Sequence, residues 1–170
     1  MTLLTFLKNT LSQTRRNHGL EHATLNVLAE KYPGRSFAGH SDPGGFWIWG
    51  EIATEELADI ILDALSRLRN GQKSLAVHQN CGTNFLVSGT LAGLAGAAGM
   101  VGAGKKSQDK LERFPLVIIL ATLALIFSQP LGPWFQKKIT TSGDPGELEV
   151  HKVTIHNQPG TAVHRIHTQG

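Results

Sequence analysis

The sequence contains little sulfur, few aromatic residues and no concentrated positive charge. Its single cysteine, Cys81, excludes an internal disulfide framework. The 16 Lys and Arg residues against 13 Asp and Glu leave a net charge of +3, which is spread along the chain without a dense basic block. No nucleic-acid-binding motif accompanies it, so we expect no nucleic-acid partner. The 170 residues are enough to bury one core.

Charge is missing altogether from two long stretches. Between Lys73 and Lys105, and again between Arg113 and Lys137, there is no Asp, Glu, Lys or Arg. Each stretch reaches the roughly 20 residues that a helix needs to cross a bilayer. We therefore predict a two-helix transmembrane hairpin over residues 85–136. The competing interpretation is that either segment is the buried helix of a soluble protein.

The first predicted span carries glycine at positions 89, 93, 96, 99 and 102. Glycine in a membrane helix allows close packing, so we expect this face to contact the second helix or another subunit of a homo-oligomer or larger membrane complex. Near the N-terminus an apolar run precedes Arg15 and Arg16, the reverse of the secretory order, which favours a cytoplasmic soluble part. The four Lys and Arg residues of the 105–113 loop favour the opposite orientation.

The remaining segments predict a small α+β domain over residues 1–84. Leucines at spacings of three, four and seven predict a long amphipathic helix over 3–29. A second amphipathic helix begins at Thr54, which we expect to be its N-cap. Short runs of β-formers between turn residues predict a three-stranded sheet. The expected strands are 35–40, 45–52 and 74–78.

The tail, residues 137–170, predicts a histidine-rich β-hairpin around the turn NQPG at 157–160. In that hairpin His151 and His164 would be diagonal neighbours on one face. No carboxylate or cysteine is interleaved with the tail histidines, so we expect solvated strand residues rather than a metal site. These histidines are His151, His156, His164 and His167.

Residues 17–24 read NHGLEHAT and place His18, Glu21 and His22 within one helical turn. Imidazoles four residues apart match the spacing that a tetrahedral zinc ion accepts. Glu21 stands directly before the second histidine and would be the general base of a catalytic site. The stripe on which they lie is expected to face the core, and buried polar groups of this kind need partners.

The run HQNCGTN, residues 78–84, supplies the most attractive further ligands, His78 and Cys81. A zinc ion held by His18, His22 and one of these two residues keeps one coordination position open for water, which is the catalytic arrangement. A zinc ion held by all four residues has no open position, and the site is then structural. The run has other interpretations. Cys81 could be a nucleophile with His78 as base, or the segment could only form the turn and cap of the following helix. A glutamate is a further candidate for the third ligand: Glu51, Glu55 or Glu56.

The five residues His18 to His22 resemble the H-x-x-E-H motif of inverzincin metallopeptidases such as the pitrilysin-like enzymes. The resemblance implies zinc held by the two histidines and Glu21 as base. In those much larger enzymes the third ligand is a glutamate on a distant helix. No recognisable counterpart of that glutamate stands in this sequence.

Over a longer range the sequence resembles a family of small bacterial membrane proteins with a domain of unknown function, common in photosynthetic bacteria. The matching segments are RRNHGLEHAT, SDPGGFWIWG, AVHQNCGTN and QKKITT, and together they span most of residues 15–141. The resemblance implies no activity. It implies that the His–Glu segment and HQNCGTN belong to one recurrent architecture, in a bacterial inner or photosynthetic membrane.

Two functions follow from these features. The first is a membrane-bound, zinc-dependent hydrolase of the peptidase class that acts beside the lipid bilayer. The second is a non-enzymatic accessory or assembly subunit of a larger membrane complex, whose histidines hold a structural metal or ligate a haem or chlorophyll-type pigment. Substitution of Glu21 separates them, because only the hydrolase needs its carboxylate for turnover.

Overall fold

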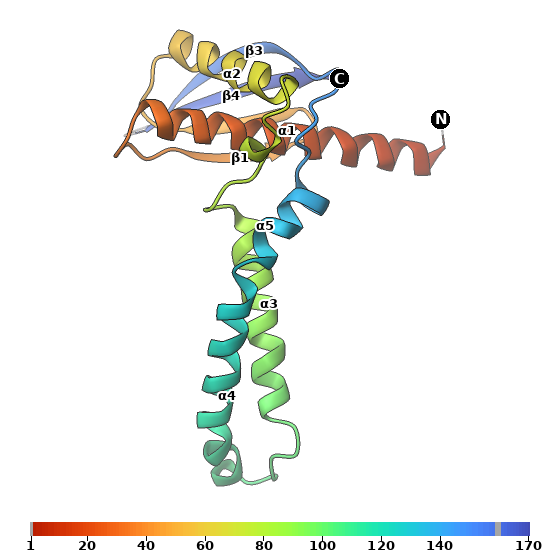
Figure 1. Cartoon of the computed structure of the whole chain (residues 1–170), viewed down its shortest axis with the longest axis vertical. Helices are drawn as coiled ribbons and strands as arrows, with labels where there is room; N and C mark the ends of the chain where they lie inside the picture. The colour runs from red at the N-terminus through yellow and green to blue at the C-terminus, as the bar shows by residue number, and fades with distance from the viewer. Residues whose placement is uncertain (1, 159–160) are drawn as a thin grey trace. The chain divides into compact units, whose positions relative to one another are not determined.

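The computed structural model describes residues 2–158 and 161–170 (Figure 1). The chain divides into two compact units, one formed by residues 1–78 and 137–170 and the other by residues 79–136. The first unit contains an antiparallel sheet with helices, and the second contains helices. The predicted α+β class is therefore confirmed.

The sheet of the first unit has four strands in the order β1-β2-β4-β3, all antiparallel. Their bounds are Ala38–Asp42 for β1, Gly45–Trp49 for β2, Glu149–Gln158 for β3 and Thr161–Gln169 for β4. The C-terminal hairpin is thus part of the sheet and not a separate appendage, because β4 pairs with β2 along the whole length of β2. Strand β2, one of the two inner strands, buries Phe46 and Ile48, and a neighbouring strand on each side bonds to its backbone.

The predicted third strand, residues 74–78, is wrong. Residues Lys73–Ala76 form a 3-10 turn, η1. The physical reason lies in the first helix, where the Asn26 side-chain amide donates to the carbonyls of Leu75 (2.9 Å) and Val77 (3.1 Å). Those carbonyls therefore bond to a helix side chain and not to a neighbouring strand.

Two helices accompany the sheet, α1 (Leu3–Lys31) and α2 (Thr54–Arg69). Figure 1 shows them lying across the sheet. Both helices were predicted, but α2 begins at Thr54 itself with Ala53 as N-cap and no side-chain capping bond, so the expected capping role of Thr54 is wrong. The core between helices and sheet is apolar and includes Leu20, Leu28, Phe46, Ile48, Leu57, Ile61 and Ile166.

The opposite face of the sheet carries a polar and aromatic cluster. Arg165 donates two hydrogen bonds to the Asp42 carboxylate (2.8 and 2.9 Å) and lies over the Trp47 ring, 5.0 Å from its centroid. Burial alone would raise the pKa of Asp42, but the bonds from Arg165 and from the Gly44 amide outweigh it and lower the pKa. Asp42 is therefore a turn and ion-pair residue.

His164 is fully buried on the core face, opposite Ile48 on β2 and Ile155 on β3. The predicted diagonal pairing of His151 with His164 is wrong, because the hairpin register places Ile155 opposite His164, four residues away from His151. Within the described residues neither ring nitrogen of His164 has a hydrogen-bond partner. Burial lowers its pKa below the ordinary 6.5, although Glu51 acts in the opposite direction.

This burial predicts a pH-dependent stability. The unfolded chain binds a proton at His164 below about pH 6.5, whereas the folded chain does so only at lower pH, so stability falls as the pH drops through this window. We expect the denaturant midpoint to be lower at pH 5.5 than at pH 7.5, and the difference to shrink in His164→Leu. Exposed His156→Leu is the matched control. An unchanged pH difference in His164→Leu would contradict the assignment.

The second unit contains α3 (Gly82–Gly99), α4 (Ser107–Ser128) and the short α5 (Leu131–Phe135), followed by the π-helical turn η2 (Gln136–Thr140). Helices α3 and α4 pack together, with Gly96 and Gly99 against Val117. Gly89 and Gly93 face open space, so only part of the predicted glycine face is used here. Asn84 links the ends of the unit, donating to the Gln79 carbonyl and accepting from the Gln136 amide (both 2.6 Å).

Only α4 among the described helices is long and apolar enough to span a membrane, and 6% of its most apolar window is buried. The predicted two-helix transmembrane hairpin is therefore not confirmed. Helix α3 begins with Gly82, Thr83 and Asn84 and continues with many glycines, which lower its mean hydropathy. One helix, α4, has the length and composition of a membrane span, and this is weak support for membrane association.

Candidate metal centre

His18 and His22 lie on one face of α1, as their spacing predicts. Their ring centroids are 4.3 Å apart in an edge-to-face arrangement. Ligand nitrogens of the two rings lie within 4.8 Å of each other. Two imidazoles are therefore close enough to share one ion.

Both rings are held in a defined tautomer by backbone carbonyls. His18 Nδ1 lies 3.0 Å from the Thr140 carbonyl oxygen, and His22 Nδ1 lies 2.9 Å from the Ala76 carbonyl oxygen. A carbonyl oxygen only accepts, so each Nδ1 carries a proton, and in the neutral imidazole each Nε2 then carries the lone pair. Metal-binding histidines are typically oriented in this way, with the second nitrogen donating to a carbonyl or carboxylate. The donor set thus fits a zinc ion.

His78 joins the two histidines of α1. Its ring centroid lies 5.7 Å from that of His22, and the side chain is half-buried. Burial lowers the pKa of His78, which favours the neutral imidazole that binds metals. Cys81 follows three residues later, directly before α3, and its side chain is buried. Three of the four predicted ligands therefore gather in the sheet-containing unit.

Glu21 is buried, with 4% of its surface exposed, and its carboxyl faces Gly39 of β1. A Cβ at Gly39 would overlap the Glu21 side chain, so glycine there leaves room for the carboxyl. The glutamates considered as a third ligand have other roles. Glu51 accepts from the Ala162 amide, Glu56 bonds to Tyr32 and Lys31, and Glu55 is exposed on the first turn of α2.

Asn17 is a supporting residue that the sequence analysis did not identify. Its amide donates to the carbonyls of Asp42 (2.8 Å) and Pro43 (3.2 Å), and its side-chain oxygen accepts from the Thr168 hydroxyl (2.6 Å). These bonds join α1 to the β1–β2 turn and to β4. The available signal was an asparagine inside a helix on its buried side, where an unpartnered amide is costly.

Gly19 is the second supporting residue that was missed. A Cβ at this position would overlap the backbone oxygen of Ser142, so only glycine allows the loop after η2 to approach α1 this closely. The Ser142 amide donates to the Arg15 carbonyl (2.8 Å) in the same contact. The close approach of this loop to α1 places the Thr140 carbonyl within hydrogen-bonding distance of His18. The signal was a glycine inside an otherwise regular helix.

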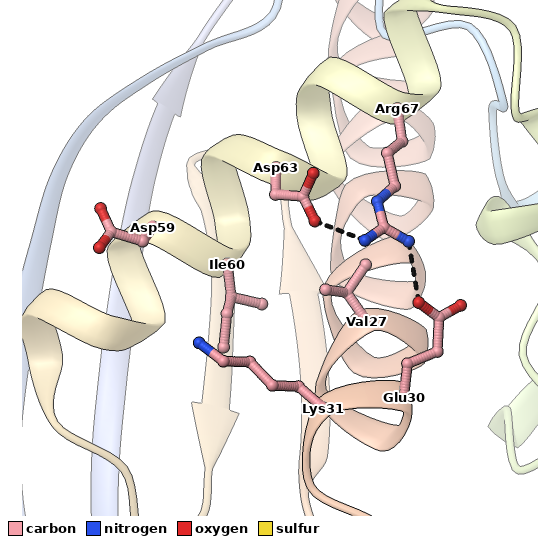
Figure 2. Close-up of a pocket in the computed structure, with 7 residues that line it drawn as sticks. All are labelled: Val27, Glu30, Lys31, Asp59, Ile60, Asp63 and Arg67. Atoms are coloured by element: carbon pink, nitrogen blue, oxygen red, sulfur yellow. Dashed lines mark hydrogen bonds and ion pairs between the residues drawn. The ribbon is translucent and has the colours of Figure 1, made fainter.

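A separate hollow between α1 and α2 holds charged residues of both signs (Figure 2). Arg67 bonds to Glu30 and Asp63 (both 2.8 Å) across it. The bond that Arg67 donates to Asp63, followed by the one that it donates to Glu30, raises the pKa of Arg67. Its lining has neither histidine nor cysteine, and its two cations stand against three carboxylates, so it is a solvated groove crossed by surface ion pairs.

Comparison with known proteins places the chain in a family. Residues 13–153 match the domain of unknown function DUF6391. The chain belongs to the DUF6391 family. The matched range includes NHGLEHAT and HQNCGTN, and it ends within β3.

One similar protein is an uncharacterised protein from the cyanobacterium Picosynechococcus sp.. It is 36% identical over 138 residues, which cover 75% of this chain and 65% of the relative, so the match spans less than two thirds of that protein. No solved structure matches the chain. Membership in DUF6391 confirms the predicted uncharacterised family and lends no activity.

Proposed function

We propose that this DUF6391 protein is a membrane-bound, zinc-dependent hydrolase of the peptidase class. The observation that carries the proposal is the pair His18 and His22, whose ring centroids lie 4.3 Å apart and whose Nδ1 atoms are bonded to backbone carbonyls, which leaves Nε2 of each neutral ring as the metal-binding nitrogen. Such a pair on one helical turn is typical of zinc sites.

The ligand set that we propose is His18 and His22 with His78 or Cys81. His78 lies beside His22, and the thiolate of Cys81 is a ligand type that zinc accepts. Bound zinc would supply a Lewis acid that polarises a carbonyl group. Glu21, one turn from His18, would accept and return a proton.

The membrane assignment rests on apolar surface. Side chains of α4 such as Ile118, Ile119 and Phe127 are more than half exposed, an arrangement that lipid stabilises and water does not. We propose that α4, together with α3, anchors the protein in a bacterial inner or photosynthetic membrane with the sheet-containing unit in the cytoplasm, in a homo-oligomer or larger complex.

A second candidate is an accessory subunit with a structural zinc. It is favoured by the burial of His22 and Cys81, which are 2% and 5% exposed, because a closed four-ligand site needs no access for substrate. A haem or chlorophyll-type pigment fits less well. Its macrocycle on one imidazole would displace the other ring, whose centroid is only 4.3 Å away.

Glu21→Gln tests the hydrolase proposal. We expect zinc content to be retained and cleavage of a fluorogenic casein by the detergent-solubilised protein to fall about 10²–10⁴-fold, since the amide accepts no proton. Glu55→Gln, on the exposed first turn of α2, should keep full activity. Equal activity in the two variants, or none in the zinc-loaded wild type, would leave the accessory role.

A further inference from the structure

A second cavity, of about 210 Å³, lies in the sheet-containing unit, where η1 and the loop after η2 meet α1. Three cationic residues line it, Arg15, Lys73 and Lys137, against one carboxylate, Asp144. The Asp144 carboxylate also accepts a bond from the Gly146 amide (3.0 Å), which fixes it within its own turn. The cavity is therefore strongly positive.

These cations are not paired with carboxylates in the way that the cation of the α1–α2 hollow in Figure 2 is. There, Arg67 is bonded to two carboxylates. In the part of the chain that the structure describes, Arg15, Lys73 and Lys137 take part in no ion pair. Like charges gathered around one hollow repel each other, and a bound anion would remove that repulsion.

Arg15 is oriented before any ligand binds. Its Nη2 donates to the carbonyls of Lys138 (3.1 Å) and Thr141 (3.2 Å). Its Nε is buried and has no acceptor among the described residues. A planar guanidinium held in place loses little entropy on binding and matches the oxygens of a phosphate group.

The apolar start of α1 indicates where that phosphate comes from. Leu11 is 63% exposed and stands one turn, or about 6 Å along the axis, before Arg15. An apolar helix face of this kind lies in the membrane interface, and the following cationic turn then lies at the level of the lipid headgroups. The exposed apolar residues of this segment are Leu3, Leu4, Phe6, Leu7 and Leu11.

We propose that this cavity binds the phosphate group of an anionic membrane phospholipid. Free phosphate is the other source of the same chemistry. The inference does not depend on a metal at the histidines, because Lys73 and Lys137 are exposed cavity residues outside the proposed ligand set.

The test compares two double variants of the full chain in mild detergent, by native mass spectrometry with phosphatidylglycerol and with zwitterionic phosphatidylcholine. Lys73→Gln with Lys137→Gln should weaken phosphatidylglycerol binding by about 10–30-fold. Lys31→Gln with Lys152→Gln removes the same charge from exposed positions outside the cavity and should leave binding within about twofold. Zinc content should be equal in both.

The two double variants give results that either support or overturn a phospholipid-binding cavity. Equal weakening in the two double variants, or none in the cavity variant, would overturn it. Inorganic phosphate supplies the second arm: millimolar phosphate that binds the wild type but not the cavity variant, without preference for phosphatidylglycerol over phosphatidylcholine, would assign the site to free phosphate and overturn the lipid source. If zinc content is unchanged in both double variants, a loss of lipid binding cannot be attributed to a loss of the metal, and the hydrolase proposal is unaffected by the result.

Discussion

Replacing His22 with alanine is expected to weaken zinc binding by about 10²–10³-fold, because the proposed site would lose one of its ligands. His22 is central to the cluster: its ring lies 4.3 Å from that of His18 and 5.7 Å from that of His78. The measurement is competition for zinc between the detergent-solubilised protein and a chromophoric chelator.

Two controls separate ligation from positioning. Asn26→Ala removes the bonds to the carbonyls of Leu75 and Val77 and loosens η1 in the way that loss of the His22–Ala76 bond does, but it removes no ligand. His156→Ala removes an exposed histidine from β3. We expect Asn26→Ala to lose at most about tenfold in affinity, as outer-shell changes do. A His22→Ala protein that binds zinc as tightly as His156→Ala would show that the histidine is not a ligand.

Replacing Asn17 with alanine is expected to lower the free energy of unfolding by about 3 kcal/mol. The substitution removes three hydrogen bonds and leaves the carbonyls of Asp42 and Pro43 and the hydroxyl of Thr168 without their partner. Buried polar groups that lose a partner are costly, and Asn17 is fully buried. Denaturant unfolding followed by tryptophan fluorescence measures the change.

Thr168→Val removes only one of these bonds and should cost about 1 kcal/mol. Asn9→Ala, on the exposed part of the same helix, should change stability by less than about 0.5 kcal/mol. If Asn17→Ala were no more destabilising than Asn9→Ala, the hydrogen bonds of Asn17 would not stabilise the contact between α1 and the sheet.

The helices could be predicted from the sequence because their signal is local. The apolar residues of α2, among them Leu57, Ile61 and Leu68, recur at helical spacing and are buried as that spacing predicts. The sheet could only be predicted in part, because β4 pairs with β2 across more than one hundred residues of chain and no local pattern encodes that pairing. Residues 74–78 have a strand-like composition, yet the Asn26 side chain donates hydrogen bonds to the carbonyls of Leu75 and Val77, so these carbonyls do not pair with a strand.

The same division between local and distant information applies to the site. The spacing of His18 and His22 predicts their shared face. Their orientation depends on the carbonyls of Thr140 and Ala76, and a carbonyl is present at every residue, so its position cannot be read from residue types. The approach of the Ser142 backbone to Gly19 is likewise fixed by tertiary structure.

The most direct test of a zinc site on α1 is the metal content of the untagged protein, purified in mild detergent and measured by mass spectrometry beside His22→Ala and Cys81→Ala. We predict about one zinc per chain in the wild type and its loss in both variants, which would join NHGLEHAT and HQNCGTN in one site. A wild-type protein without metal, together with variants of unchanged stability, would contradict the zinc site and the hydrolase built on it.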